Sequence, residues 1–102
     1  MKKRQSIKEY YIAIFKSRNY VMHLHQHLNR KGLLEYELIS TPCKIEAGCS
    51  YSLKFYNLQQ LDVLLRESRL INRKIDSIYL IERKNKKRYY SEIDFYSRLP
   101  LI

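Results

Sequence analysis

The chain of 102 residues has no tryptophan and only two each of glycine, proline and cysteine. Two glycines are too few for P-loop or dinucleotide-binding loops, which need several at fixed spacing. Two cysteines are too few for a disulfide framework. The longest early apolar run, residues 12–15, is shorter than the core of a signal peptide and far shorter than a membrane span. We therefore expect a cytoplasmic protein with no membrane segment, whose cysteines are free thiols at rest.

The remaining composition is that of a folded domain. Apolar residues make up 45% of the chain and aromatic residues 13%, which is enough to bury a core. A chain of this length forms one compact domain. The sequence has no nucleophile elbow and no paired carboxylates that suggest a catalytic cleft. It therefore favours a non-enzymatic carrier or adaptor over an enzyme, and it implies no cofactor.

Positive charge is concentrated at the two ends of the chain. The formal net charge is +10, but residues 9–82 carry ten basic against eight acidic residues, whereas the flanks carry ten against two. This distribution predicts a basic N-terminal extension at 1–8, a domain at 9–82 and a basic, tyrosine-rich C-terminal extension at 83–102. Such flanks favour solubility and weak contact with nucleic acid.

Hydrophobic periodicity predicts an α+β domain. The mostly apolar YYIAIF is typical of a strand covered on both faces, and LLEYELIS and YSLKF alternate like strands covered on one face. In order, we expect a strand at 10–15, a helix between Ser17 and Gly32, strands at 33–40 and 51–55, a helix from Asn57 to Ser68, and a strand at 78–81. This β-α-β-β-α-β order favours a ferredoxin-like sandwich, with two helices on one antiparallel sheet. Residues 84–87 are expected to turn the chain into an added strand, although they lack the Asn-Gly of a firm hairpin signal.

Both cysteines lie in TPCKIEAGCSYSLKF, residues 41–55. In the expected topology, the connection after the first strand lies at the same end of the sandwich as the connection between the second and third strands. The fold should therefore bring Lys16, Ser17 and Arg18, at the start of the first helix, toward Cys43 and Cys49.

Such surroundings suit a reactive thiol. Helix N-terminal amides and cations stabilise the thiolate, and Lys44 would add to this field. Gly48 permits backbone conformations closed to other residues, and Pro42 stiffens the loop entry. For Cys43, a role as a small packing residue is an equal alternative. A lasting disulfide is disfavoured in a reducing compartment, and the spacing of the two cysteines does not suit a zinc site.

The stretch from Tyr10 to Phe55 resembles the selenium/sulfur carrier protein-like family. The match as a whole covers roughly residues 8 to 70. The most specific part is Thr41-Pro42, followed by Ile45 and then by Ala47-Gly48-Cys49. Family members commonly have Gly-Cys-Gly and an Arg after the Pro, where this chain has Ser50 and Cys43.

The resemblance implies that Cys49 carries sulfur or selenium as a persulfide or selenide adduct. It also implies donor and acceptor proteins as partners. Cys43 would then be a resolving thiol that releases the cargo by forming a disulfide with Cys49. A thiol redox switch without cargo fits the same residues.

Two other interactions are open alternatives. The basic tails fit a nucleic-acid- or ribosome-associated module, and an edge strand or the tyrosine-rich tail fits a homodimer. Strand alternation argues against base stacking on the open sheet face, since it places Glu35, Glu37 and Lys54 there. On the first helix, His23 and His27 are expected to be exposed, opposite its apolar stripe, and they lack a third metal ligand.

Overall fold

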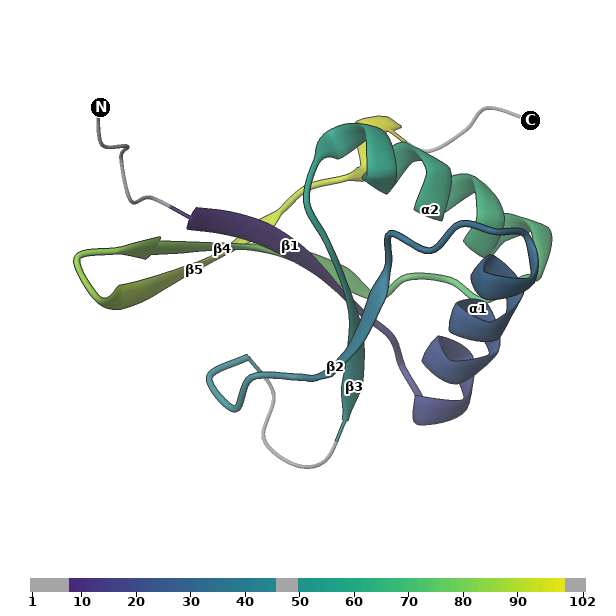
Figure 1. Cartoon of the computed structure of the whole chain (residues 1–102), viewed down its shortest axis with the longest axis horizontal. Helices are drawn as coiled ribbons and strands as arrows, with labels where there is room; N and C mark the ends of the chain where they lie inside the picture. Colours follow the sequence, from purple (N-terminus) through teal and green to yellow (C-terminus); the bar gives the residue numbers. More distant parts are fainter. Residues whose placement is uncertain (1–7, 46–49, 99–102) are drawn as a thin grey trace.

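The computed structural model describes residues 8–45 and 50–98, in which two helices pack on one face of a single sheet (Figure 1). Asn57 caps the second helix through its side-chain oxygen, and of the two candidate caps for the first helix, Ser17 and Asn19, the structure uses Ser17. The elements are β1 (Lys8–Ile14), α1 (Arg18–Arg30), β2 (Glu37–Ser40), β3 (Tyr51–Phe55), α2 (Leu58–Leu70), β4 (Ser77–Lys84), β5 (Lys87–Ile93) and the short 3-10 helix η1 (Tyr96–Arg98).

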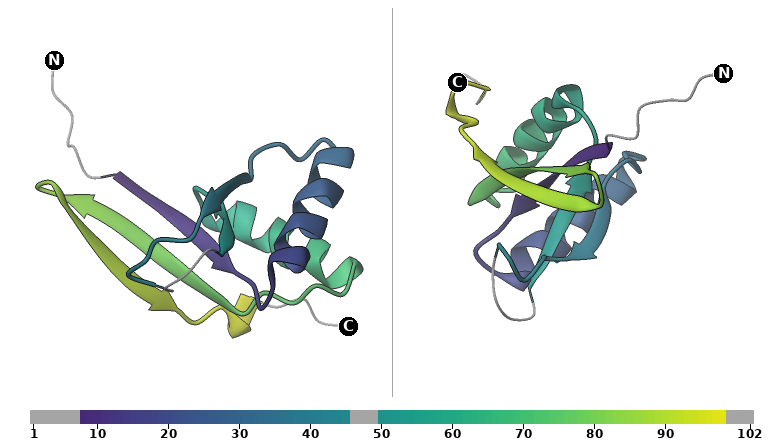
Figure 2. Two further views of the ribbon diagram at one scale, coloured as in Figure 1. Left: turned by 90° about the horizontal axis from the view of Figure 1, so that it is seen from below. Right: turned by 90° about the vertical axis from the view of Figure 1, so that its left-hand side faces the viewer.

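The sheet has five antiparallel strands in the order β2-β3-β1-β4-β5. The first four strands have the order of a ferredoxin-like sandwich, which confirms the fold class predicted from the sequence. β5 is the added strand, and with β4 it forms a hairpin that extends away from the helices (Figures 1 and 2). β1 is the central strand, so it pairs on both sides.

The strand predicted at 33–40 is wrong in its first half. β2 begins at Glu37, and Leu34, expected to face the helices, is 71% exposed. β3 provides pairing partners for β2 only from Tyr51 to Lys54. Tyr36 is instead buried, and its hydroxyl donates to the carbonyl oxygen of Gln60 at the start of α2. Burial raises the pKa of the Tyr36 hydroxyl well above its usual value.

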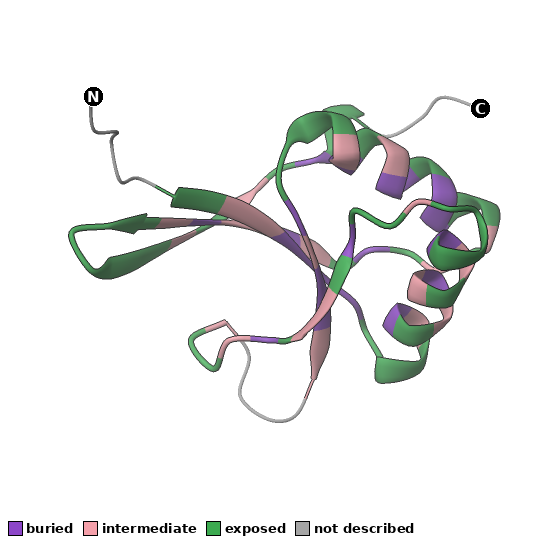
Figure 3. Cartoon of the chain, in the orientation of Figure 1, coloured by how far each residue is buried: buried purple, intermediate pink, exposed green. Residues whose placement is uncertain are grey.

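The helical side of the sheet holds the main core. Tyr11 stacks on Phe55 with ring centroids 5.4 Å apart. Figure 3 shows the buried positions concentrated where α1 and α2 meet the strands. The apolar residues that are fully inaccessible to solvent on this side are Ala13, Val21, Leu24, Leu28, Leu53, Phe55, Leu61, Leu64 and Ile78.

The face of the sheet away from the helices, called the open face below, also carries an apolar cluster. Ile12, Ile14 and Ile81 are buried on it. The partly buried side chains that pack against these three are Tyr10, Ile39, Ile45, Tyr79 and Tyr90. Glu37 and Lys54 lie on this face, as the strand alternation predicts. The expected lack of aromatic rings is wrong, because β1, β4 and β5 add Tyr10, Tyr79 and Tyr90.

A buried carboxylate joins the two helices. Glu67 of α2 has no solvent-accessible surface, and its Oε1 lies 2.8 Å from His27 Nε2. Lys31 Nζ donates to both carboxylate oxygens at 3.0 and 3.1 Å, and Arg66 adds two longer bonds.

The predicted exposure of His27 and His23 is wrong, because both side chains are partly buried. His23 Nδ1 accepts a hydrogen bond from Arg73 Nε at 3.1 Å.

The β4–β5 hairpin turns through Asn85 and Lys86, whose φ angles are 50° and 68°. Two central residues with positive φ match the twist of the flanking strands, as in type I′ hairpins. Asn tolerates this conformation, whereas a lysine there is strained by its Cβ. The turn therefore forms without the glycine that would have identified it in the sequence.

The Glu67 cluster makes stability depend on pH. Burial raises the pKa of the Glu67 carboxyl, but hydrogen bonds from His27, Lys31 and Arg66 outweigh it and leave this pKa below its ordinary value. A lowered pKa contributes stability above the ordinary value, and that stability is lost as pH falls through the folded-state pKa. We expect Glu67→Gln to lower the free energy of unfolding at pH 7 by about 1–3 kcal/mol. Below about pH 4 its unfolding curve should approach that of the wild type.

Urea unfolding between pH 3 and 8 measures this effect. Asp62→Asn is the matched control, because Asp62 pairs with Arg98 at an exposed position. This control should destabilise the protein less. A Glu67→Gln protein that matches the wild type at every pH would contradict the assignment.

The strained turn gives a second prediction. Lys86→Gly should raise the free energy of unfolding by about 0.5–1 kcal/mol, since glycine adopts positive φ without steric cost. Lys84→Gly removes the same charge from a β4 position and should lower stability. Thermal unfolding compares the two variants. Destabilisation by Lys86→Gly would show that the lysine side chain stabilises the turn.

Candidate functional site

The loop that contains both cysteines is closed at its base by β2 and β3. Ser40 pairs with Tyr51, and the Thr41 N–H donates to the Ser50 carbonyl oxygen at 2.9 Å. The buried hydroxyls of Thr41 and Ser52 hydrogen-bond to each other. These bonds extend the β2–β3 ladder by one rung and fix both ends of the loop.

The first half of the loop turns back over the open face. The Ile45 N–H donates to the Pro42 carbonyl oxygen at 3.0 Å, which closes a tight turn. Ile45 then packs against the apolar cluster of the open face. Cys43 and Lys44, at the centre of this turn, are exposed, and Cys43 is a free thiol. Cys43 is therefore not a buried packing residue, which the sequence had left as an equal alternative.

The start of α1 lies beside the mouth of this loop, as the topology predicts. Ile14, at the end of β1, pairs with Ser52 near the start of β3. Ser17 caps α1, and its Oγ accepts from the Tyr20 N–H at 3.3 Å. The Arg18 guanidinium carbon lies 5.1 Å from the centre of the Tyr51 ring. The first helical turn thus presents a cation to the strand that leaves the loop.

Lys16 lies apart from this arrangement. It lines a hollow of about 410 Å³ with residues of the α2–β4 connection. The other lining residues are Tyr20, Asn72, Lys74, Ile75, Asp76 and Tyr96. The structure thus shows a contact at the loop mouth for Arg18, and it places Lys16 with a different set of neighbours.

Gly48 and Cys49 lie outside the described residues. Ser50, the next residue, is described, and its hydroxyl oxygen is buried without a hydrogen-bond partner in 8–45 and 50–98. A buried hydroxyl normally has a partner, since leaving one unpaired costs about 1–3 kcal/mol. Ser50 therefore places an unused hydrogen-bonding group directly after the cysteine, at the position where family members commonly have glycine.

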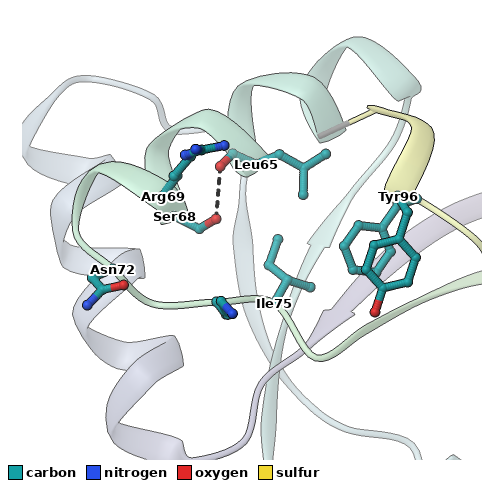
Figure 4. A pocket seen from close by; sticks show the side chains of 8 residues that line it. Leu65, Ser68, Arg69, Asn72, Ile75 and Tyr96 are labelled. Atoms are coloured by element: carbon teal, nitrogen blue, oxygen red, sulfur yellow. Dashed lines mark hydrogen bonds between the residues drawn. The ribbon is translucent and has the colours of Figure 1, made fainter. Parts of the chain in front are cut away.

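Another hollow lies away from the cysteine loop, between α2 and η1 (Figure 4). Its volume is about 450 Å³, and its walls include Leu65, Ile75 and Tyr96. The Ser68 hydroxyl in its wall donates to the Leu65 carbonyl oxygen of its own helix at 3.0 Å. The polar atom is thus satisfied within α2, and the hollow contains no residue of the described part of the cysteine loop.

The described ranges contain no group of three or more His, Cys, Asp or Glu side chains arranged to hold a metal ion. In the same ranges, no helix is both long enough and apolar enough to cross a membrane.

The fold and the closed loop define a class: a small ferredoxin-like domain with an exposed thiol on the β2–β3 connection. The family model described as "Putative Se/S carrier protein-like" matches residues 10–80 of this chain. The chain therefore belongs to this family, as the resemblance in the sequence predicts. Comparison with curated proteins and with solved structures gives no significant match.

Sequence reasoning missed the polar groups that hold the loop. Thr41 was singled out as part of the family pattern, but its bonds to Ser50 and Ser52 were not foreseen. The sequence did contain a signal for these bonds, because small hydroxyl residues stand at both ends of the loop. A hydroxyl pair across neighbouring strands is a common cross-strand contact.

Proposed function

We propose that the protein carries sulfur or selenium on Cys49 for transfer between partner proteins in a reducing compartment. The observation that carries this proposal is the position of Arg18 and the capped N-terminus of α1 beside Tyr51, two residues after Cys49. A cation and helix amides at this place stabilise a thiolate on the loop. The family to which the chain belongs is named for the same cargo.

Loading is an exchange reaction. The Cys49 thiolate attacks the terminal sulfur of a donor protein's persulfide, and the new S–S bond forms as the donor's own S–S bond breaks. The donor leaves as a thiolate, so the step needs no oxidant. The Ser50 hydroxyl, which has no hydrogen-bond partner among the described residues, supports the proposal, because it can donate to a negatively charged adduct.

Release can follow two routes. An acceptor thiolate can attack the terminal sulfur and take it, which regenerates the Cys49 thiolate. Alternatively, Cys43 attacks the Cys49 sulfur, hydrosulfide leaves, and a Cys43–Cys49 disulfide forms that a dithiol reductant then reopens. The exposure of Cys43 supports the second route.

The nucleic-acid alternative is supported by an ordered part of the molecule. Arg83 and Lys84 belong to β4, and Lys87 and Arg88 belong to β5. The basic C-terminal segment therefore presents its charge from a hairpin with a fixed geometry, in addition to any contribution from the chain ends.

A homodimer through a sheet edge has less support. β2 is an edge strand of four residues, and β5, the other edge, carries Lys87 and Arg88. Short edges and edge cations both hinder strand pairing between copies.

The carrier proposal predicts a covalent adduct. After incubation with a cysteine desulfurase and cysteine, the intact mass of the wild type should increase by one or more sulfur atoms. Cys49→Ser should remain unmodified. Cys43→Ser is the matched control and should keep its adduct longer, because the resolving thiol is absent. An unmodified wild type, or an adduct that persists in Cys49→Ser, would contradict the proposal.

The positive charge at the loop mouth predicts that the Cys49 thiol reacts at a lower pH than a free cysteine. In a Cys43→Ser background, the rate of iodoacetamide alkylation at Cys49 should have a midpoint below the ordinary pKa of about 8.5. Arg18→Gln should move this midpoint upward, because removing a cation destabilises the thiolate. Arg30→Gln, at the other end of α1, should leave it unchanged. Equal midpoints in all three proteins would show that α1 does not act on Cys49.

A further inference from the structure

A row of three cations crosses the open face near the tip of the hairpin. Lys8 of β1 pairs with Arg83 of β4, and Arg83 pairs with Arg88 of β5. The next row along the same strands is Tyr10, Ile81 and Tyr90, whose side chains belong to the open-face cluster. Since side chains alternate between faces, residues two positions apart share a face. Lys8, Arg83 and Arg88, called the basic row below, therefore lie on the open face.

This arrangement is unfavourable within the chain. Like charges directly opposite each other on neighbouring strands destabilise a sheet. The basic row contains two such pairs, and Lys84 opposite Lys87 adds a third. Lys84 is relieved by Glu82 at 3.8 Å, but no residue of the basic row has an ion pair within 8–45 and 50–98. An anionic partner would relieve the repulsion that these ranges leave uncompensated.

Aromatic rings lie directly beside these cations. Tyr90 and Tyr79 lie on the open face in diagonal positions of the β4–β5 pair. Arg88 lies two positions from Tyr90 on the same face of β5, and the Tyr79 hydroxyl donates to Glu92. On the other flank, Lys54 Nζ lies 4.4 Å from the centre of the Tyr10 ring. Rings alternating with cations match the repeat of a single-stranded nucleic acid, in which bases and phosphates alternate.

The carboxylates nearest the hairpin tip lie on the face opposite the basic row, together with Lys84 and Lys87. By the same alternation, Glu9 and Glu82 lie on the helical side and pair with each other. Among the residues of the five strands, two carboxylates, Glu37 and Glu92, lie on the open face, away from the basic row. At the tip, Lys86 occupies a backbone conformation that favours glycine. A cation is therefore present at the tip despite its conformational cost.

We propose that the open face of β1, β4 and β5 binds single-stranded nucleic acid, through phosphate contacts with the basic row and base stacking on Tyr90 and Tyr79. Such a surface tolerates different base sequences, because every base presents an aromatic face. The hairpin extends beyond the helices (Figures 1 and 2), so an extended strand reaches it without meeting α1 or α2. This surface is independent of the thiol chemistry of the loop.

Fluorescence anisotropy with labelled 20-nucleotide oligo(U) and oligo(dT), and with a duplex of equal length, tests the proposal. We expect tighter binding to the single strands than to the duplex. The double variant Arg83→Ser/Arg88→Ser should reduce the slope of log affinity against log salt by about 0.7 for each phosphate that is no longer neutralised. Arg30→Ser/Lys74→Ser removes the same charge from exposed positions on the helical side and should leave this slope nearly unchanged.

Substitution of Tyr90 separates stacking from charge. Tyr90→Leu should weaken binding at least about fivefold, whereas Tyr90→Phe, which keeps the ring, should stay near wild type. Tyr96→Leu, at an exposed position on the helical side, is the matched control and should have no effect. Circular dichroism checks that each variant is folded.

Three results would overturn the proposal. The first is equal affinity for single strands, duplex and heparin, which would show general attraction to polyanions. The second is an equal decrease in affinity and salt slope in the two double variants. The third is unchanged binding in Tyr90→Leu. Each of these results is independent of whether Cys49 takes up sulfur, so the two proposals fail separately.

Discussion

The central position of β1 constrains the rest of the molecule. β1 pairs with β3 on one side and with β4 on the other, and Ile12 and Ala13, which point to opposite faces, have no solvent-accessible surface. A strand buried on both faces cannot slip by one residue without exchanging its two sets of side chains. Its register with β3 therefore fixes which end of the sheet carries the first turn of α1.

That register has a chemical consequence. Because Ile14 lies opposite Ser52, the chain leaves β1 and enters α1 beside the point where β3 begins. The mouth of the cysteine loop is held at this point by the bonds of Thr41. Arg18 reaches Tyr51 for the same reason. The surroundings of the loop thus result from strand pairing and not from any local sequence motif.

The two faces of the sheet have different roles. The helical side contains the larger core, and the buried Glu67 locks α1 to α2 through His27 and Lys31. The open face has a smaller apolar cluster, which Ile45 of the cysteine loop helps to cover. The cysteine loop and the basic hairpin therefore both border the open face.

Local patterns predicted what depends on near neighbours. The caps at Ser17 and Asn57, the strand at 51–55 and the order of elements all follow from residues within a few positions of one another. The failures involve distant partners. Leu34 lies outside the sheet because β3 provides no pairing partner for it. His27 is partly buried because it contacts Glu67, which is 40 positions away along the chain. The tyrosines of the open face were missed because the alternation of side chains was followed only along the second and third strands.

The sequence by itself determined the fold class, the family and the identity of the candidate thiols, because periodicity, capping residues and the Thr-Pro and Gly-Cys pattern are all properties of short segments. Only the tertiary structure decided that Arg18 meets Tyr51, that Glu67 is buried among cations, and that Lys8, Arg83 and Arg88 form one row. Each of these contacts joins segments far apart in the chain, and strand register, which no single segment contains, sets the distance between them.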